Sequence, residues 1–229
     1  MPAEAQRRAY LEALDIDVWA LRAAASTASG GDADDVPLQE AQIEDWSGLR
    51  DTVSACTLCA LHRTRTQTVF GVGSVSADWM IIGEAPGAEE DRRGEPFVGR
   101  AGKLLDEMLR AVGLARETVY IANTLKCRPP NNRDPAVDEA ASCRAYLDRQ
   151  ISLVSPKLIL AVGRIASQLL LATDAPLGRL RGKKHYLPGG QIPVVVTYHP
   201  AYLLRSPIQK RKAWQDLCLA RQIVCELSA

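Results

Sequence analysis

Four short apolar runs, separated by segments with helical periodicity, constrain the fold of this chain more than any other feature. The runs span residues 79–83, 119–123, 158–163 and 192–198. One segment with helical periodicity follows each run, and we predict helices at 103–112, 135–153, 164–171 and 210–227. Uninterrupted apolar strands that alternate with helices are typical of a parallel sheet covered by helices on both faces. We therefore predict an α/β fold around a mainly parallel, four-stranded sheet.

In sheets of this kind, ligands bind beyond the carboxyl ends of the strands. Three of the predicted strand ends carry suggestive residues. The first run leads into Gly83-Glu-Ala-Pro-Gly87, the second ends in Asn123, and the fourth is followed by His199. The acids of the first loop exclude a phosphate cradle, and its sequence is neither a P-loop nor a dinucleotide fingerprint. We expect a binding site at this edge of the sheet.

Charge divides the chain into an acidic arm and a basic body. Residues 1–48 hold ten acidic and three basic side chains, whereas 49–229 hold 17 acidic and 25 basic ones. We predict a helical arm over 1–24, a flexible acidic linker over 25–42 and one domain over 43–229. The linker is rich in small and acidic residues that cannot bury a core. A basic body suits a polyanionic partner, although many basic proteins bind none.

No window of the sequence reaches the roughly 18 apolar residues of a membrane span. The N-terminus also lacks the basic start and apolar run of a secretory signal. We therefore expect a cytoplasmic protein without a membrane partner. In that compartment, cysteines are thiols or metal ligands rather than disulfides.

The six cysteines fall into two groups. Cys56 and Cys59 form a C-x2-C pair, and Cys127 and Cys143 follow after 67 and 15 intervening residues. Four thiolates can hold tetrahedral zinc or an iron–sulfur cluster, and buried unliganded thiols are a third possibility. The spacing leaves these possibilities open. The other two, at 218 and 225, are expected to pack in the core from the last predicted helix.

The strand-end residues each have an ordinary structural explanation as well. The carboxamide of Asn123 can pair with a ligand edge or cap a turn. His199 can donate to a developing anion or be a satisfied structural histidine. Phe97 can face a ligand or fill the core. The residues by themselves do not choose between these roles.

Six motifs in order along the chain resemble those of family 4 uracil-DNA glycosylases, the iron–sulfur members of their superfamily. The motifs are Cys56-x2-Cys59, Arg65-Thr-Gln-Thr-Val-Phe-Gly71, Gly83-Glu-Ala-Pro-Gly-x-x-Glu-Asp91, Gly94-Glu-Pro-Phe-Val-Gly99-Arg-Ala-Gly, Asn123-x-x-Lys-Cys-Arg-Pro-Pro130 and Thr197-Tyr-His-Pro-Ala-Tyr-Leu-Leu204. The resemblance runs from Cys56 to the last helix, and the arm lies outside it.

The resemblance implies a three-layer α/β/α sandwich with a structural 4Fe–4S cluster on Cys56, Cys59, Cys127 and Cys143. It implies hydrolysis of the N-glycosidic bond of uracil in single- or double-stranded DNA, which releases free uracil and leaves an abasic site. Such a DNA repair enzyme is expected in the cytoplasm, associated with the nucleoid when it acts on DNA. A monomer is the default, and the arm is a candidate for binding an unidentified protein.

The resemblance also implies roles for residues that contact the base. Glu84, Asn123 and His199 are the expected catalytic residues. Asn123 reads the uracil edge, and neutral His199 donates to O2. The best-known uracil glycosylases carry an aspartate where Ala85 stands here, so Glu84 is the candidate for orienting the water.

Further residues are assigned by the same resemblance to base and DNA binding. The expected base contacts are the stacking ring of Phe97, the backbone of Ala85, the Pro86 turn, and Glu90, which excludes the methyl group of thymine. The expected DNA contacts are Leu203 and Leu204 as apolar wedges, with Arg205 and Arg181 on the phosphates.

Three other functions remain compatible with the sequence. One is a superfamily glycosylase that prefers hypoxanthine, xanthine or mismatched bases. Another is an electron-transfer iron–sulfur protein, which would be reduced reversibly and release no base. The third is a non-catalytic DNA-binding module whose arm recruits a partner.

Overall fold

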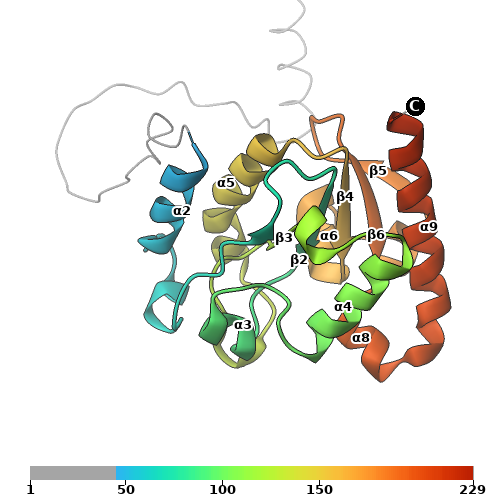
Figure 1. The fold of residues 1–229 in the computed structure, drawn as a ribbon. Helices are drawn as coiled ribbons and strands as arrows, with labels where there is room; N and C mark the ends of the chain where they lie inside the picture. The colour runs from blue at the N-terminus through green and yellow to red at the C-terminus, as the bar shows by residue number, and fades with distance from the viewer. Residues whose placement is uncertain (1–44, 229) are drawn as a thin grey trace, which may run out of the picture. The chain divides into compact units, whose positions relative to one another are not determined.

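The computed structural model of the chain describes residues 45–228. The predicted helical arm, 1–24, and the predicted linker, 25–42, lie outside the described residues. The predicted domain, 43–229, falls almost entirely within them, and Figure 1 shows its helices and strands.

The described residues form a six-stranded sheet with the order β1-β3-β2-β4-β6-β5. The strands are β1 (Val72–Gly73), β2 (Trp79–Gly83), β3 (Tyr120–Asn123), β4 (Leu158–Val162), β5 (Lys184–Tyr186) and β6 (Pro193–Thr197). The four inner strands pair in parallel, and β1 and β5 pair antiparallel at the two edges. The predicted α/β fold and mainly parallel sheet are confirmed, and the predicted count of four strands is wrong. The missed edge strands are only two and three residues long and lack an apolar run.

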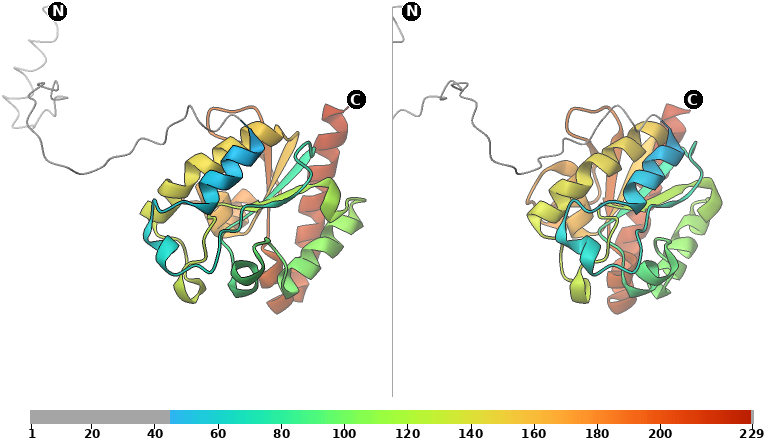
Figure 2. Two further views of the ribbon diagram at one scale, coloured as in Figure 1. Left: turned by 60° about the vertical axis from the view of Figure 1, so that its left-hand side comes forward. Right: turned by 90° about the vertical axis from the view of Figure 1, so that its left-hand side faces the viewer.

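Helices cover both faces of the sheet, as Figures 1 and 2 show. The helices are α2 (Trp46–Ser54), α3 (Ala88–Arg93), α4 (Arg100–Ala111), α5 (Val137–Val154), α6 (Arg164–Leu171), α7 (Leu177–Leu180), α8 (Pro200–Arg205) and α9 (Lys210–Leu227). Short 3-10 turns lie at η2 (Ala60–Arg63), η3 (Arg116–Thr118), η4 (Pro130–Asn132) and η5 (Pro207–Gln209). The four helices predicted within the domain correspond to α4, α5, α6 and α9.

Alternate residues of each strand enter opposite cores, which is the period of a sheet buried on both faces. Ile81 and Leu160 pack with residues of α4 and α9 in one core. Met80 and Ile159 pack with residues of α5 and α6 in the other. The α2 helix lies alongside α5 on this second side (Figure 2). These two cores give the three-layer α/β/α arrangement that the resemblance implied.

Parallel pairing brings the carboxyl ends of the inner strands to one edge. Gly83 of β2 pairs with Asn123 of β3, and Val162 of β4 pairs with Thr197 of β6. The loops that follow these residues therefore lie beside one another. None of the helices in the described part of the chain is long and apolar enough to cross a membrane.

Candidate active site

Gly83 lies where two predicted site residues meet. A Cβ atom at this position would come within 2.4 Å of Asn123 Oδ1 and 2.6 Å of Phe97 Cζ. Real Cβ atoms do not approach other heavy atoms so closely, so only glycine leaves both side chains where they are. The end of β2 therefore forms the floor on which the side chains of Asn123 and Phe97 lie.

His199 joins this pair from the loop after β6. Its ring and that of Phe97 are stacked, with centroids 5.5 Å apart and planes inclined by 28°. Its Cβ would lie 3.1 Å from a Cβ placed on Gly163, whose φ is +101°. The structure thus brings together three side chains that are far apart in sequence, as the sequence analysis expected.

Phe97 is held in an uncommon backbone conformation, with φ at 55° and 6% of the residue exposed. Positive φ is strained for an aromatic residue and persists only where surrounding contacts enforce it. Arg116 supplies such contacts, because its guanidinium donates to the carbonyls of Pro96 and Phe97. A Cβ on Gly102 would fall 1.7 Å from the Phe97 carbonyl oxygen, so this position also requires glycine. The ring orientation is therefore fixed by the backbone around it.

His199 presents a defined tautomer. Its Nδ1 accepts a hydrogen bond from the backbone N–H of Ala201 at 3.1 Å, so the proton of the neutral ring is on Nε2. Burial lowers the pKa of His199 to about 4, and the positive charge of Arg205 acts in the same direction. The ring is consequently neutral near pH 7 and can offer its Nε2–H to an acceptor.

Asn123 is buried at the end of β3, with 2% of the residue exposed. Within residues 45–228 its carboxamide makes no hydrogen bond, although its backbone carbonyl accepts one from Lys126. A carboxamide without a partner in the protein is open to hydrogen bonds from a ligand or from water. It can offer one acceptor and one donor to a ligand edge.

Glu84 follows directly after the glycine floor. Burial raises the pKa of its carboxyl to about 7; the negative charge of Asp134 adds to this effect, and Arg164 opposes it. The side chains of Arg164 and Asp134 form an ion pair at 2.8 Å. Glu84 can therefore hold or release a proton near neutral pH, as a group that activates water must.

Glu90 fastens two loops of the site together. Its Oε2 accepts from the backbone N–H of Gly87 at 3.1 Å, and its Oε1 accepts from that of Val98 at 3.2 Å. Its neighbour Asp91, 4% exposed, accepts from the N–H and the hydroxyl of Thr66. The structural roles of Glu90 and Asp91 could not be predicted from the sequence, because these roles depend on contacts between loops that are distant along the chain.

Ala85 and Pro86 form the turn between β2 and α3. Pro86 is buried, and Ala85 packs against the apolar cluster that contains Cys127 and Cys143. The loop after β2 and the cysteine region are therefore in direct contact.

The predicted DNA contacts separate into exposed and buried residues. Leu203 is 1% exposed and belongs to the core, so the structure does not support it as a wedge. It lies on the face of α8 that packs inward, whereas the next residue, Leu204, is 38% exposed. Arg205 at the end of α8 is also exposed.

Arg181 is committed to contacts inside the domain. Its guanidinium donates to both carboxylate oxygens of Asp216, at 2.8 and 3.1 Å, and lies over the ring of Tyr198. Its side chain is 14% exposed, and that of Asp216 is fully buried. The structure therefore places Arg181 in an internal ion pair rather than on an open surface.

Four cysteines line one pocket, with Lys126, Arg65 and Tyr146 among the other lining residues. The cysteines are Cys56, Cys59, Cys127 and Cys143. Arg65 Nη1 donates to Cys127 Sγ at 3.1 Å. Burial raises the pKa of Cys143 to about 11, so this thiol ionises at neutral pH only if a metal binds it.

The four thiols are donors of a kind that binds either zinc or an iron–sulfur cluster. Among residues 45–228, no three cysteine, histidine or carboxylate side chains are arranged to hold one metal ion. Zinc requires all its sulfurs about 2.3 Å from one point. In a 4Fe–4S cluster each thiolate binds a different iron, so the sulfurs lie farther apart.

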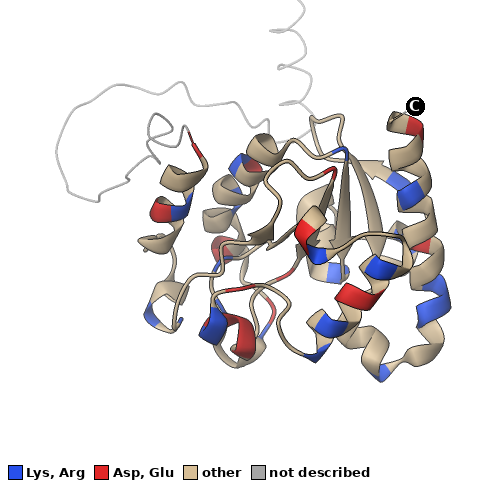
Figure 3. Ribbon diagram, in the orientation of Figure 1, with Lys and Arg blue, Asp and Glu red and all other residues tan. Residues whose placement is uncertain are grey.

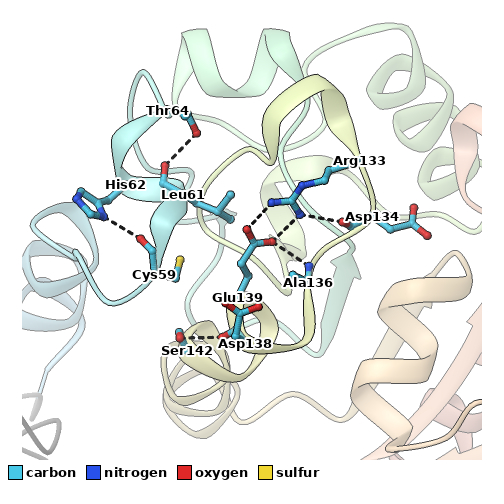
Figure 4. Close-up of polar contacts among 10 residues, drawn as sticks. All are labelled: Cys59, Leu61, His62, Thr64, Arg133, Asp134, Ala136, Asp138, Glu139 and Ser142. Carbon is cyan, nitrogen blue, oxygen red and sulfur yellow. Dashed lines mark hydrogen bonds and ion pairs between the residues drawn. The ribbon is translucent and has the colours of Figure 1, made fainter. Parts of the chain in front are cut away.

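The loops around this pocket are held by their own hydrogen bonds (Figure 4). His62 Nδ1 donates to the carbonyl of Cys59 at 2.8 Å. Arg133 pairs with the buried carboxylate of Glu139 at 2.6 and 2.8 Å, and its own side chain remains 45% exposed. Cys218 and Cys225 lie exposed on α9, so the prediction that they pack in the core is wrong.

A sequence profile of the uracil DNA glycosylase superfamily matches residues 70–218, which include every strand and the three converging side chains. The chain belongs to this superfamily. Among curated relatives, the type-4 uracil-DNA glycosylase of Archaeoglobus fulgidus is 46% identical over 170 residues, or 72% of this chain and 85% of the relative. That of Thermotoga maritima is 45% identical over 157 residues, or 68% and 81%. That of Pyrobaculum aerophilum is 40% identical over 181 residues, or 76% and 92%. The resemblance to family 4 of the superfamily is thereby confirmed.

Proposed function

We propose that this chain is a DNA repair enzyme that hydrolyses the N-glycosidic bond of uracil in single- and double-stranded DNA. It releases free uracil and leaves an abasic site. The observation that carries this proposal is the convergence of Phe97, Asn123 and His199 around Gly83 in a member of the uracil DNA glycosylase superfamily.

Base recognition begins with extrusion of the nucleotide from the stack, which costs a few kcal/mol. The ring of Phe97 stacks on the extruded base. The carboxamide of Asn123 accepts from N3–H of uracil and donates to O4. Cytosine presents the reverse pattern of donor and acceptor, so it would leave buried polar groups unpaired.

Cleavage produces a cationic sugar and a uracil anion. His199 donates its Nε2–H to O2 of uracil and stabilises the negative charge as it develops. This role requires the neutral ring and the Nε2 proton, both of which follow from the contact with Ala201 and from burial. Losing one such donor costs about 3 kcal/mol of transition-state stabilisation.

Glu84, in its ionised form, orients the water that attacks the sugar. The backbone N–H of Ala85 adds a donor at the base, and Pro86 shapes the turn that presents it. Glu90 lies beside C5 of uracil and excludes the methyl group of thymine; its bonds to Gly87 and Val98 keep it in place.

DNA contacts come from the end of α8 and the start of α9. Leu204 enters the space that the base leaves, and Arg205 contacts the strand. Lys210, Arg211 and Lys212 are exposed nearby, and Figure 3 shows basic residues where α8 ends and α9 begins. Arg181 supports this region through Tyr198 and Asp216 rather than through phosphate.

The four pocket cysteines hold a 4Fe–4S cluster. When bound, the cluster cross-links the segments that contain the C-x2-C pair, the turn after β3 and the α5 helix, without taking part in hydrolysis.

The domain over 43–229 carries the activity, and we place the enzyme in the cytoplasm, at the nucleoid when it acts on DNA. We take it to be a monomer, with the arm as a binding segment for a protein partner.

A direct test uses oligonucleotides with one uracil, single-stranded and opposite guanine or adenine. We expect strand breaks after alkali treatment and free uracil in solution. Oligonucleotides with hypoxanthine, xanthine or thymine in the same position give the specificity. Intact uracil strands would defeat the proposal. Faster release of another base would show that the chain is a superfamily glycosylase that prefers that base.

A further inference from the structure

Lys126 is a buried cation in the turn that joins Asn123 to Cys127. It is 1% exposed. Its ammonium donates to the backbone carbonyl of Asn123 at 2.8 Å and to Gln150 Oε1 at 2.6 Å. Buried donors and acceptors that are paired in this way hold one geometry, because breaking either bond would leave a polar group unsatisfied.

Gln150, the second acceptor, is itself fixed. It is fully buried on α5, and its Nε2 donates to the carbonyl of Phe70 at 2.9 Å and to the hydroxyl of Tyr120 at 3.1 Å. Gln150 therefore links the ammonium of Lys126 to α5, on which Gln150 lies, and to Tyr120 of β3.

The same turn is bonded to the loop that contains the glycine floor. The backbone N–H of Thr124 donates to the carbonyl of Gly83 at 2.9 Å, and that of Leu125 donates to the carbonyl of Glu84 at 3.0 Å. A shift of this turn would therefore move the position of Asn123 relative to Glu84.

Lys126 is also one of the residues that line the cysteine pocket. In the described part of the chain both hydrogen-bond acceptors of Lys126 are neutral oxygens, and no carboxylate pairs with it. Lys126 therefore connects the cysteine pocket to the backbone of Asn123 through its own side chain.

We propose that Lys126 is a positioning residue that couples the cysteine site to base recognition by holding the backbone of Asn123. This inference rests on the proposed function, in which Asn123 reads uracil. Lys126 itself contacts neither the base nor the sugar. Its loss would leave the carboxamide present but less precisely placed.

The test compares two variants that perturb the cysteine pocket from different sides. Lys126→Met removes the donor to Asn123. Arg65→Met removes the hydrogen bonds to Cys127 Sγ and to the carbonyl of Ser54. Neither of these bonds involves Asn123. For each variant we would measure iron per chain, the thermal midpoint, the inhibition constant of free uracil and the affinity for uracil-free DNA.

Both variants are expected to lose iron, because both alter the surroundings of Cys127. At equal iron content, Lys126→Met is expected to weaken inhibition by free uracil about tenfold more than Arg65→Met, as supporting residues around a site commonly do. Its affinity for uracil-free DNA should stay unchanged. A purely structural role would lower iron and thermal midpoint in both variants without separating their uracil inhibition constants.

Uracil inhibition constants within about twofold of each other in the two variants would overturn the inference. If Lys126→Met cannot be obtained with iron, Gln150→Met replaces it, because it removes the second acceptor and leaves every cysteine untouched. This variant should weaken uracil inhibition by about two- to fivefold, and an unchanged constant would again overturn the inference. Wild-type protein that releases no uracil would instead defeat the proposed function.

Discussion

Burial acts on two titratable side chains of the site, Glu84 and His199, and in each case it favours the neutral form. It raises the pKa of Glu84 to about 7 and lowers the pKa of His199 to about 4. His199 is therefore neutral across the working range, whereas Glu84 changes charge within it. The pH dependence of the reaction rate can therefore separate the role of Glu84 from that of His199.

The first prediction concerns the pH dependence of uracil release. In single-turnover experiments the wild-type rate should rise with pH through about 7, because Glu84 must lose its proton to orient the water. Glu84→Gln should be slower and should lack this rise. A variant that keeps the wild-type profile would assign the rise to another group and remove Glu84 from the reaction.

The second prediction concerns stability at the same residue. Because burial raises the pKa of Glu84 from 4.5 to about 7, the folded state binds more protons than the unfolded state between these pH values. The carboxylate therefore lowers the free energy of unfolding progressively from about pH 4.5 to 7, and fully above that. Glu84→Gln should gain on the order of 1–3 kcal/mol at pH 8, after allowance for its partial exposure, and nothing near pH 4. Thermal midpoints at the two pH values measure this difference.

The third prediction concerns the glycine floor. Gly83→Ala would place a methyl group against Asn123 Oδ1 and Phe97 Cζ, so it should reduce uracil release by about 100-fold while DNA binding persists. Gly178→Ala is the matched control, because a Cβ there meets nothing within 4 Å. Equal activity of the two variants would show that the three converging side chains do not form the base site.

At the level of secondary structure, the inner strands could be predicted and the edge strands could not. The inner strands are buried on both faces, so each is an uninterrupted apolar run. The edge strand β5 has the exposure pattern of a surface segment, and β1 has only two residues. Their pairing depends on the neighbouring strand rather than on their own sequence.

Short helices pose a related difficulty. In α8 two adjacent leucines have similar sequence surroundings, and six residues are too few for a periodicity that identifies the buried face. Only the packing of α8 against α4 shows that Leu203 faces the core and Leu204 faces solvent.

The fourth prediction separates these two leucines. Leu203→Ala should lower the free energy of unfolding by about 2–4 kcal/mol, because it leaves a cavity in the core. Leu204→Ala should leave stability unchanged and reduce uracil release from duplex DNA more than from single strands. Thermal midpoints and the ratio of duplex to single-strand rates test both statements. An equal loss on both substrates would argue against a wedge.

In the molecule as a whole, the site could be predicted only in part. Strand ends in a parallel sheet indicated the edge at which Phe97, Asn123 and His199 converge, and the motifs named these residues. The roles of Asp91 and Arg116 as clamps could not be predicted, because each depends on loops that approach only in the folded chain. The commitment of Arg181 to Asp216 was hidden for the same reason.

The fifth prediction concerns the cysteines that join distant parts of the chain. Purified protein should be brown and contain about four irons per chain. Cys143→Ser should lose iron and melt at a lower temperature, because metal binding stabilises the folded state. Cys218→Ser, at an exposed site on α9, is the control and should retain both iron and stability. A colourless protein that contains zinc would refute the cluster.

The fixed backbone conformation of Phe97 has a consequence for substrate binding. Arg116 and Gly102 set the ring without help from any ligand. We therefore expect the ring of Phe97 to keep its position when nucleic acid binds. We expect the thermodynamic cost of forming the complex to fall mainly on the duplex, so lesions in weakly stacked or frayed sequence should be captured most readily.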